Sequence, residues 1–113
     1  MELQVIDTSR EFFHIALSGK LDVEGSQQIE ERFQDLTANS HSSAIVDMTG
    51  VTYLASLGIR LLFTCAKAVA ADGRKMIVVS PQPMVEDTLL TSGTVNFIPI
   101  ARDLNKAVTM LRE

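Results

Sequence analysis

The sequence predicts a single α/β domain, residues 1–113, built on a mixed and mostly parallel β-sheet with about four helices. Short stretches rich in apolar and β-branched residues alternate with longer amphipathic stretches, in the order β-β-α-β-α-β-α-β-α. Only a short polar turn separates the first two strands, which therefore form an antiparallel hairpin. Helices separate the later strands, and such connections join parallel strands through right-handed crossovers.

The first third of the chain predicts the hairpin and one helix. Its strands are expected at residues 3–8 and 12–18, around a turn at Ser9-Arg10-Glu11, because apolar residues alternate along the second strand. These alternating residues are Phe13, Ile15 and Leu17. A helix at residues 23–38 follows, with a solvated acidic face and a narrow core stripe, as expected of a helix on a sheet. The stripe consists of Ile29, Phe33 and Leu36.

The middle of the chain predicts a buried strand, a short turn and a long apolar helix. After a polar loop at residues 39–43, the strand covers residues 44–48. The helix covers residues 57–72 and opens at Ser56, a preferred N-cap residue. It stops before Gly73, since glycine suits the left-handed conformation that ends many helices.

The C-terminal third predicts two further strands and two further helices. A buried strand at residues 75–79 leads to Ser80-Pro81, which reads as a cap followed by proline at the first helical position. That helix covers residues 81–91 and ends near Gly93. A short strand at 96–100 and a helix at 103–112 complete the chain. The buried stripe of this last helix is expected to be Leu104, Val108 and Leu111.

Composition narrows the function classes. The net charge of −4 argues against direct binding of nucleic acid or an anionic membrane, and no apolar run approaches the roughly 18 residues of a membrane span. Cys65 is the lone cysteine, so a reducing, cytoplasmic location is expected, with Cys65 as a small buried residue. His14 and His41 have no partner at metal-ligand spacing, and no phosphate loop or catalytic constellation appears. We therefore expect no metal, no cofactor and no enzymatic activity.

Two features of the 57–72 helix leave alternatives open. Ser56 reads either as a plain N-cap or as a phosphorylation site, because a helix N-terminus also favours a phosphate. The helix is also more apolar than one sheet-facing side requires, since its polar residues fall on one narrow stripe. Either the first or third helix covers the excess, or Ile59 and Phe63 form a partner-binding patch beside Ser56.

The strand order and the segment at residues 46–59 resemble the STAS domain of bacterial anti-sigma factor antagonists, over nearly the whole chain. In that family the strand-to-helix turn usually reads Asp-Ser-Ser/Thr-Gly-Leu, and its first serine is phosphorylated. Aligned on Gly58, that serine falls on Ser56. Two further segments resemble family turns. They are Gly19-Lys20-Leu21-Asp22, whose acidic residue lies near the phosphorylation site, and Thr91-Ser92-Gly93.

Two positions depart from the family pattern. Ala55 stands where the family has aspartate, and Leu57 stands where it has a second hydroxyl residue. The loss of the aspartate removes a negative charge beside the expected phosphoacceptor.

The resemblance implies a binding protein under phosphorylation control. Such a protein binds a serine-kinase anti-sigma factor when unphosphorylated, is released by phosphorylation, and is restored by a PP2C-type phosphatase. Ser56 is the implied acceptor, and Asp22 is the nearby polar contact or simply a helix cap. The implied contact surface is Leu57, Gly58, Ile59 and Phe63. Two other classes stay open, namely an unphosphorylated accessory subunit of a membrane transporter or phospholipid-transport complex, and a small-molecule-binding or enzymatic domain.

Overall fold

One five-stranded sheet organises the protein in the computed structural model, which describes residues 1–9 and 11–113. The strands lie side by side in chain order, with β1 and β2 antiparallel and each later pair parallel. The strands are β1 (Glu2–Thr8), β2 (Phe12–Leu21), β3 (Ser43–Leu54), β4 (Met76–Val79) and β5 (Ile100–Ala101). The predicted mixed sheet is therefore confirmed. Arg10, at the centre of the predicted turn, lies outside the described residues.

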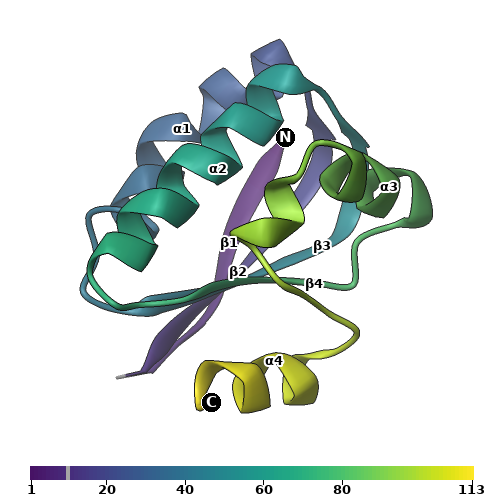
Figure 1. Cartoon of the computed structure of the whole chain (residues 1–113). Coiled ribbons are helices and arrows are strands. Elements are labelled where there is room, and N and C mark those ends of the chain that lie inside the picture. The colour runs from purple at the N-terminus through teal and green to yellow at the C-terminus, as the bar shows by residue number, and fades with distance from the viewer. Residues whose placement is uncertain (10) are drawn as a thin grey trace.

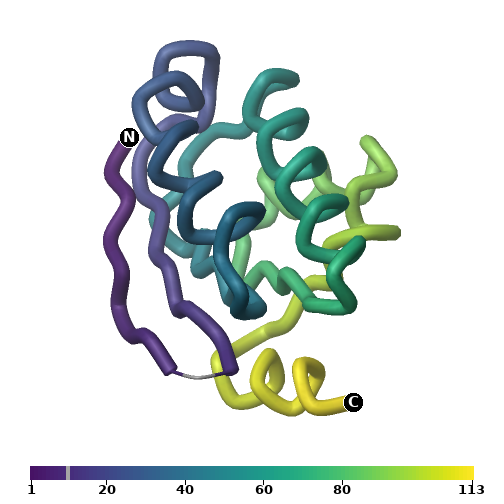
Figure 2. The backbone as a smooth tube through the Cα atoms, turned by 90° about the vertical axis from the view of Figure 1, so that its left-hand side faces the viewer, coloured from purple at the N-terminus to yellow at the C-terminus, as the bar shows by residue number. Residues whose placement is uncertain are grey.

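The helices cover the two faces of the sheet unequally. They are α1 (Val23–Leu36), α2 (Ser56–Ala71), α3 (Pro83–Thr91) and α4 (Leu104–Leu111), with a 3₁₀ turn, η1, at Thr94–Asn96. In Figure 1, α1, α2 and α3 lie on one side of the sheet and α4 on the other. Figure 2 shows α1 beside the N-terminal hairpin and α2 next to α1. The main core fills the space beneath these first three helices.

The main core contains the side chains that the alternating pattern predicted. Ile15 and Leu17 of β2 are buried and Phe13 is half-buried, while Phe33 of α1 is fully buried. Cys65 of α2 is buried in the same core, as expected. A smaller cluster under α4 packs on the other face of the sheet.

The third strand is much longer than predicted. The sequence indicated a turn after residue 48, but β3 continues through Leu54, so one residue alone separates it from α2. The continuation forms because β2 is also longer and supplies pairing partners, with Gly19 opposite Val51 and Leu21 opposite Leu54. Two register shifts, one between Ala16 and Ser18 and one between Gly19 and Lys20, interrupt the regular pairing of this extension.

The start of the third helix was placed two residues too early. Ser80 does not cap it, because the Ser80 N–H donates to the Ala101 carbonyl and extends the pairing of β4 with β5. Its backbone takes the left-handed conformation, with φ of 52°. The helix begins instead at Pro83, after the extended residue Gln82, so the second of the two prolines occupies the first helical position.

The C-terminal strand is shorter than predicted, and the last helix is less buried than predicted. The expected strand at 96–100 is wrong over most of its length, since η1 occupies its start and two residues alone pair with β4. On α4, Asp103 caps the N-terminus and Ala107 is buried. The predicted stripe is only half-buried at Val108 and Leu111, and Leu104 is exposed.

One largely buried arginine, Arg74, connects the loop after α1 to the end of α2. Arg74 is 10% exposed, and its Nη1 atom donates to the carbonyls of Thr37, at 2.9 Å, and Ser42, at 2.8 Å. Its Nη2 atom donates to the Ala38 carbonyl at 3.3 Å and to Asp72 Oδ2 at 2.7 Å. A single cation therefore satisfies three backbone acceptors of one loop, at residues 37–42, that lies far from Arg74 in sequence.

Replacing this arginine is expected to destabilise the fold. Arg74→Ala should lower the free energy of unfolding by on the order of 2–4 kcal/mol, because it leaves several carbonyls without donors. Arg112→Ala is the matched control, since the Arg112–Glu11 ion pair spans 3.4 Å between largely exposed side chains. It should cost less than about 1 kcal/mol. Urea denaturation measures both, and equal losses would contradict the structural role of Arg74.

Candidate functional site

Parallel pairing of β2 with β3 brings the two predicted site segments together. Leu21 pairs with Leu54 at the ends of these two strands. The next residues in the chain, Asp22 and Ala55, therefore lie next to each other at the same end of the sheet. The Ala55 N–H also donates to the Leu21 carbonyl at 3.1 Å. The N-terminus of α1 and the N-terminus of α2 therefore emerge side by side.

Ser56 is the first residue of α2 rather than its N-cap. The cap residue is Ala55, which is extended, with φ of −106° and ψ of 175°, and makes no side-chain cap bond. The first backbone bond of the helix runs from the Ile59 N–H to the Ala55 carbonyl, at 3.0 Å. The N-cap interpretation of Ser56 is thus wrong by one position, because Ala55 rather than Ser56 takes the extended conformation of a cap.

The Ser56 side chain is exposed at the start of α2. Within the described residues its hydroxyl takes part in no side-chain hydrogen bond. The N–H groups at the start of α2 have no side-chain acceptor from Ala55. A helix N-terminus of this kind carries partial positive charge and favours an anion.

Asp22 caps α1. Its Oδ1 atom accepts a hydrogen bond from the Gly25 N–H at 2.8 Å, and the residue is half-buried. The cap interpretation of Asp22 is confirmed, and its role as a contact beside a phosphorylated Ser56 stays a prediction. The same carboxylate can do both, because a cap bond uses one of its two oxygens.

Gly58 allows the first turn of α2 to approach the β2–α1 turn. A Cβ atom at this position would lie 2.6 Å from the Leu21 carbonyl oxygen and 2.7 Å from Leu21 Cγ. The nearer of these is a backbone atom, which can move only if the paired strand β2 moves with it. The close approach of α2 therefore requires glycine at this position.

The excess apolar surface of α2 is covered from two directions. Leu57 and Leu61 face α1, as one of the two interpretations expected. On the other side, the Phe63 ring packs edge-on against Phe97, with 4.8 Å between the ring centroids. Lys67 Nζ lies 5.5 Å from the centre of the Phe63 ring. The cover on that side thus comes from the segment after η1 rather than from α3.

Half-buried positions remain beside Ser56. Leu57, Ile59 and Phe63 are half-buried, and Ile59 packs against the core. Their use as a partner surface stays a prediction.

Sequence reasoning missed two exposed apolar residues of this region. Val23 directly follows Asp22 and is 57% exposed, and Tyr53 at the end of β3 is 49% exposed. The signal for Val23 was its position outside the core stripe of α1. Tyr53 was assigned to a turn, so its place on a strand was not foreseen.

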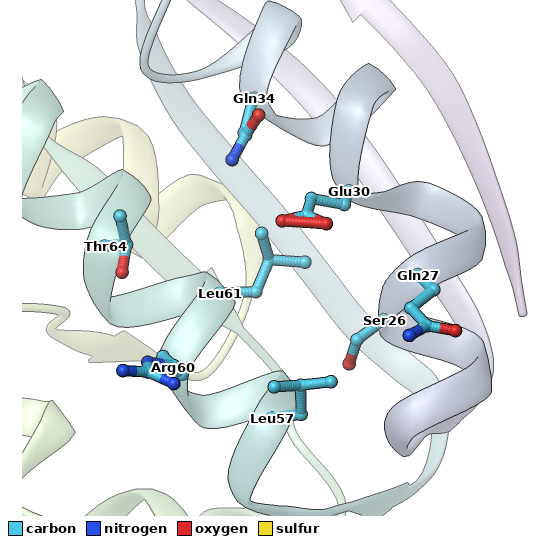
Figure 3. Close-up of a pocket in the computed structure, with 8 residues that line it drawn as sticks. All are labelled: Ser26, Gln27, Glu30, Gln34, Leu57, Arg60, Leu61 and Thr64. Carbon is cyan, nitrogen blue, oxygen red and sulfur yellow. The ribbon is translucent and has the colours of Figure 1, made fainter.

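A cavity of about 430 Å³ lies between α1 and α2 and starts at Leu57, next to Ser56. We call it the α1–α2 groove. Its walls are Ser26, Gln27, Glu30 and Gln34 from α1 and Leu57, Arg60, Leu61 and Thr64 from α2. Figure 3 shows Ser26, Glu30 and Gln34 extending from α1 toward α2.

Other reactive side chains of the described residues do not form a site. Burial raises the pKa of the Cys65 thiol above its ordinary value, which disfavours the nucleophilic thiolate. In residues 1–9 and 11–113, no three His, Cys, Asp or Glu side chains gather as metal ligands. Over the same residues, no helix has the length and apolar character needed to cross a bilayer.

The sequence matches the family model for the STAS domain over residues 4–107. Because this match covers most of the chain, the protein belongs to the STAS domain family. No curated protein sequence matches it significantly.

Several solved structures share the fold. The anti-sigma factor antagonist SpoIIAA in its unphosphorylated form has a TM-score of 0.79 and 21% identity, over 98% of this chain and 96% of that chain. The phosphorylated form of the Bacillus cell fate determinant SpoIIAA has a TM-score of 0.68 and 22% identity, over 98% and 100%. An anti-sigma-factor antagonist (STAS) domain protein from Planctomyces limnophilus has a TM-score of 0.83 and 16% identity, over 98% of each chain.

A fourth structure is the murine anion transporter Slc26a9, solved in the inward-facing state. It has a TM-score of 0.76 and 17% identity, over 96% of this chain and 21% of that much longer chain. At such identities these likenesses establish the fold alone.

Adding a methyl group at Gly58 is expected to destabilise the protein. Alanine ordinarily favours a helix over glycine by about 1 kcal/mol. Here the clash with the Leu21 carbonyl should reverse the sign, and Gly58→Ala should lose about 1–3 kcal/mol. Ala71→Ser, at the exposed end of the same helix, adds one atom in solvent and should change stability by less than about 0.5 kcal/mol. A Gly58→Ala protein more stable than wild type in urea would contradict the close approach.

The cap role of Asp22 predicts a difference between two substitutions. Asp22→Ala removes the acceptor for the Gly25 N–H and should cost about 1 kcal/mol in thermal or urea unfolding. Asp22→Asn keeps an acceptor oxygen and should stay within a few tenths of a kcal/mol of wild type. If both variants lose the same stability, the contribution comes from charge rather than from the cap bond.

Proposed function

We propose that the protein is an anti-sigma factor antagonist of a partner-switching pathway. In its unphosphorylated form it binds a serine-kinase anti-sigma factor in the cytoplasm, and phosphorylation of Ser56 releases it. A PP2C-type phosphatase then restores the binding form, and the protein itself performs no catalysis. Membership of the STAS domain family and the likeness to anti-sigma factor antagonists support the proposal.

The observation that carries the proposal is the exposed, uncapped hydroxyl of Ser56 at the start of α2. A serine that capped the helix would have its oxygen engaged with a backbone N–H. Here the oxygen is free for a kinase, and the helix N-terminus beside it suits the phosphate that results. Ala55 supports this arrangement, because its methyl side chain leaves the first N–H groups of α2 without a competing acceptor.

Phosphorylation would act through charge at a surface fitted to a neutral hydroxyl. A phosphate adds about −1.5 to −2 charges at neutral pH. Asp22 directly follows the end of the neighbouring strand β2, and its carboxylate adds a second negative charge. Because each ~1.4 kcal/mol changes affinity tenfold, a repulsion of a few kcal/mol releases a partner without any refolding.

The proposed contact surface surrounds Ser56. Of the predicted contact residues it consists of Asp22, Leu57, Ile59 and Phe63, and we add the exposed side chains of Val23 and Tyr53. Gly58 is buried against Leu21 and supports this surface from beneath. Phe63 is half-buried and packed against Phe97, so only the remaining exposed part of its ring can contact a partner.

The second candidate function is an accessory STAS domain of a membrane transport assembly. The likeness to the murine Slc26a9 anion transporter favours this function, because nearly all of this chain matches a part of the transporter that makes up 21% of its length. In this alternative Ser56 is simply an exposed residue, and its modification has no effect on assembly.

The two functions predict different behaviour of Ser56 variants as baits in native cell extract. Ser56→Ala should retain a kinase-like protein with an ATP-binding domain, and Ser56→Asp should lose it by at least tenfold, or about 1.4 kcal/mol. Thr109→Asp is the matched control, because it adds the same charge to α4 on the opposite face of the sheet. Mass spectrometry identifies the partners, and the affinity of the purified pair confirms the effect.

Other outcomes decide against the proposal. Equal binding of the kinase-like protein by Ser56→Ala and Ser56→Asp would exclude the switch. Identical partner sets that contain transporter subunits would establish the accessory domain instead.

A further inference from the structure

We propose that the α1–α2 groove binds a small zwitterion of the amino-acid or short-peptide class. The inference is independent of the proposed function, since it concerns the side chains between the helices rather than Ser56. The cavity of about 430 Å³ lies within the size range of small-molecule sites.

The charges of the groove carry the inference. Glu30 on α1 and Arg60 on α2 both line the cavity and are exposed. Neither takes part in an ion pair within 4.0 Å among the residues that the structure describes. In Figure 3 the Glu30 carboxylate points toward α2, whereas the Arg60 guanidinium lies on the side of α2 away from α1, from which this exposed side chain can turn toward the cavity. A single ligand can then join the two charges, with its ammonium group at the carboxylate and its carboxylate at the guanidinium.

The uncharged lining suits the middle of such a ligand. Ser26 is 3% exposed, and its Oγ atom has no hydrogen-bond partner. Such an unpaired buried hydroxyl is unusual, and a hydrogen-bonding occupant would supply its missing partner after a small side-chain rotation. Gln27 and Gln34 each offer a donor and an acceptor, which match the N–H and C=O groups of a peptide bond.

The same lining argues against a nucleotide or a phosphate. None of the side chains that line the cavity is aromatic, so a planar base finds no stacking surface. Arg60 is the single cation among them, and Glu30 would repel an anionic ligand. Leu57 and Leu61 add apolar surface for a short aliphatic side chain.

The test titrates ¹⁵N-labelled full-length protein with the dipeptide L-alanyl-L-glutamine. The amide chemical shifts of the residues that line the groove should change and reach saturation, with Kd in the millimolar range or below. N-acetylation of the dipeptide removes its ammonium charge, and C-amidation removes its carboxylate. Each change should weaken binding at least tenfold, or ~1.4 kcal/mol.

Two variants assign the two charges. The Arg60→Gln protein should bind the dipeptide and its C-amide equally weakly. The Glu30→Gln protein should bind the dipeptide and its N-acetyl form equally weakly. Lys67→Gln on α2 and Glu31→Gln on α1 are the matched controls, because both residues are exposed and lie outside the groove. Both controls should bind the dipeptide as wild type does.

The inference is overturned if no saturable shift appears up to about 20 mM dipeptide. It is also overturned if the three forms of the dipeptide bind equally, or if the control variants weaken binding as much as the groove variants. None of these outcomes bears on the Ser56 switch, which the bait experiment decides separately.

Discussion

The candidate site depends on the contact between the first turn of α2 and the Leu21 carbonyl. That carbonyl accepts the Ala55 N–H at 3.1 Å, and it leaves no room for a Cβ at Gly58. The contact fixes where α2 begins relative to β2, and so it fixes the position of Ser56. It also sets α1 and α2 close together, which creates the groove between them.

This arrangement joins a rigid scaffold to a chemically free hydroxyl. Leu62, Cys65 and Val69 of α2 are fully buried in the core. Modification of an exposed side chain at the start of the helix is therefore expected to leave this packing unchanged. The Ser56 side chain takes part in no hydrogen bond among the described residues, so its modification is expected to cost the fold little. A surface residue on a rigid helix end suits a switch that changes binding and leaves structure intact.

The order of the elements and the antiparallel hairpin were predictable from periodicity and turn length, because alternation in β2 and the core stripe of α1 are strong local signals. The end of β3 was not predictable, because Thr49, Gly50 and Thr52 resemble a turn, and the segment forms a strand through pairing with the extension of β2. Ser56 as a phosphorylation site stays a proposal, whereas its predicted cap role was wrong by one position, because Ala55 takes the extended backbone of the cap. The groove had no sequence signal, since its walls come from two helices whose facing sides are set by packing.

Phosphosite mapping tests the central claim most directly. The wild-type protein is incubated with ATP and with the kinase-like protein that the Ser56→Ala bait captures. Peptides of the wild-type protein are then sequenced by mass spectrometry. The account predicts a single phosphate, on Ser56, and none on the Ser56→Ala protein. Phosphate on another residue with Ser56 unmodified, or equal phosphorylation of the Ser56→Ala protein, would contradict it.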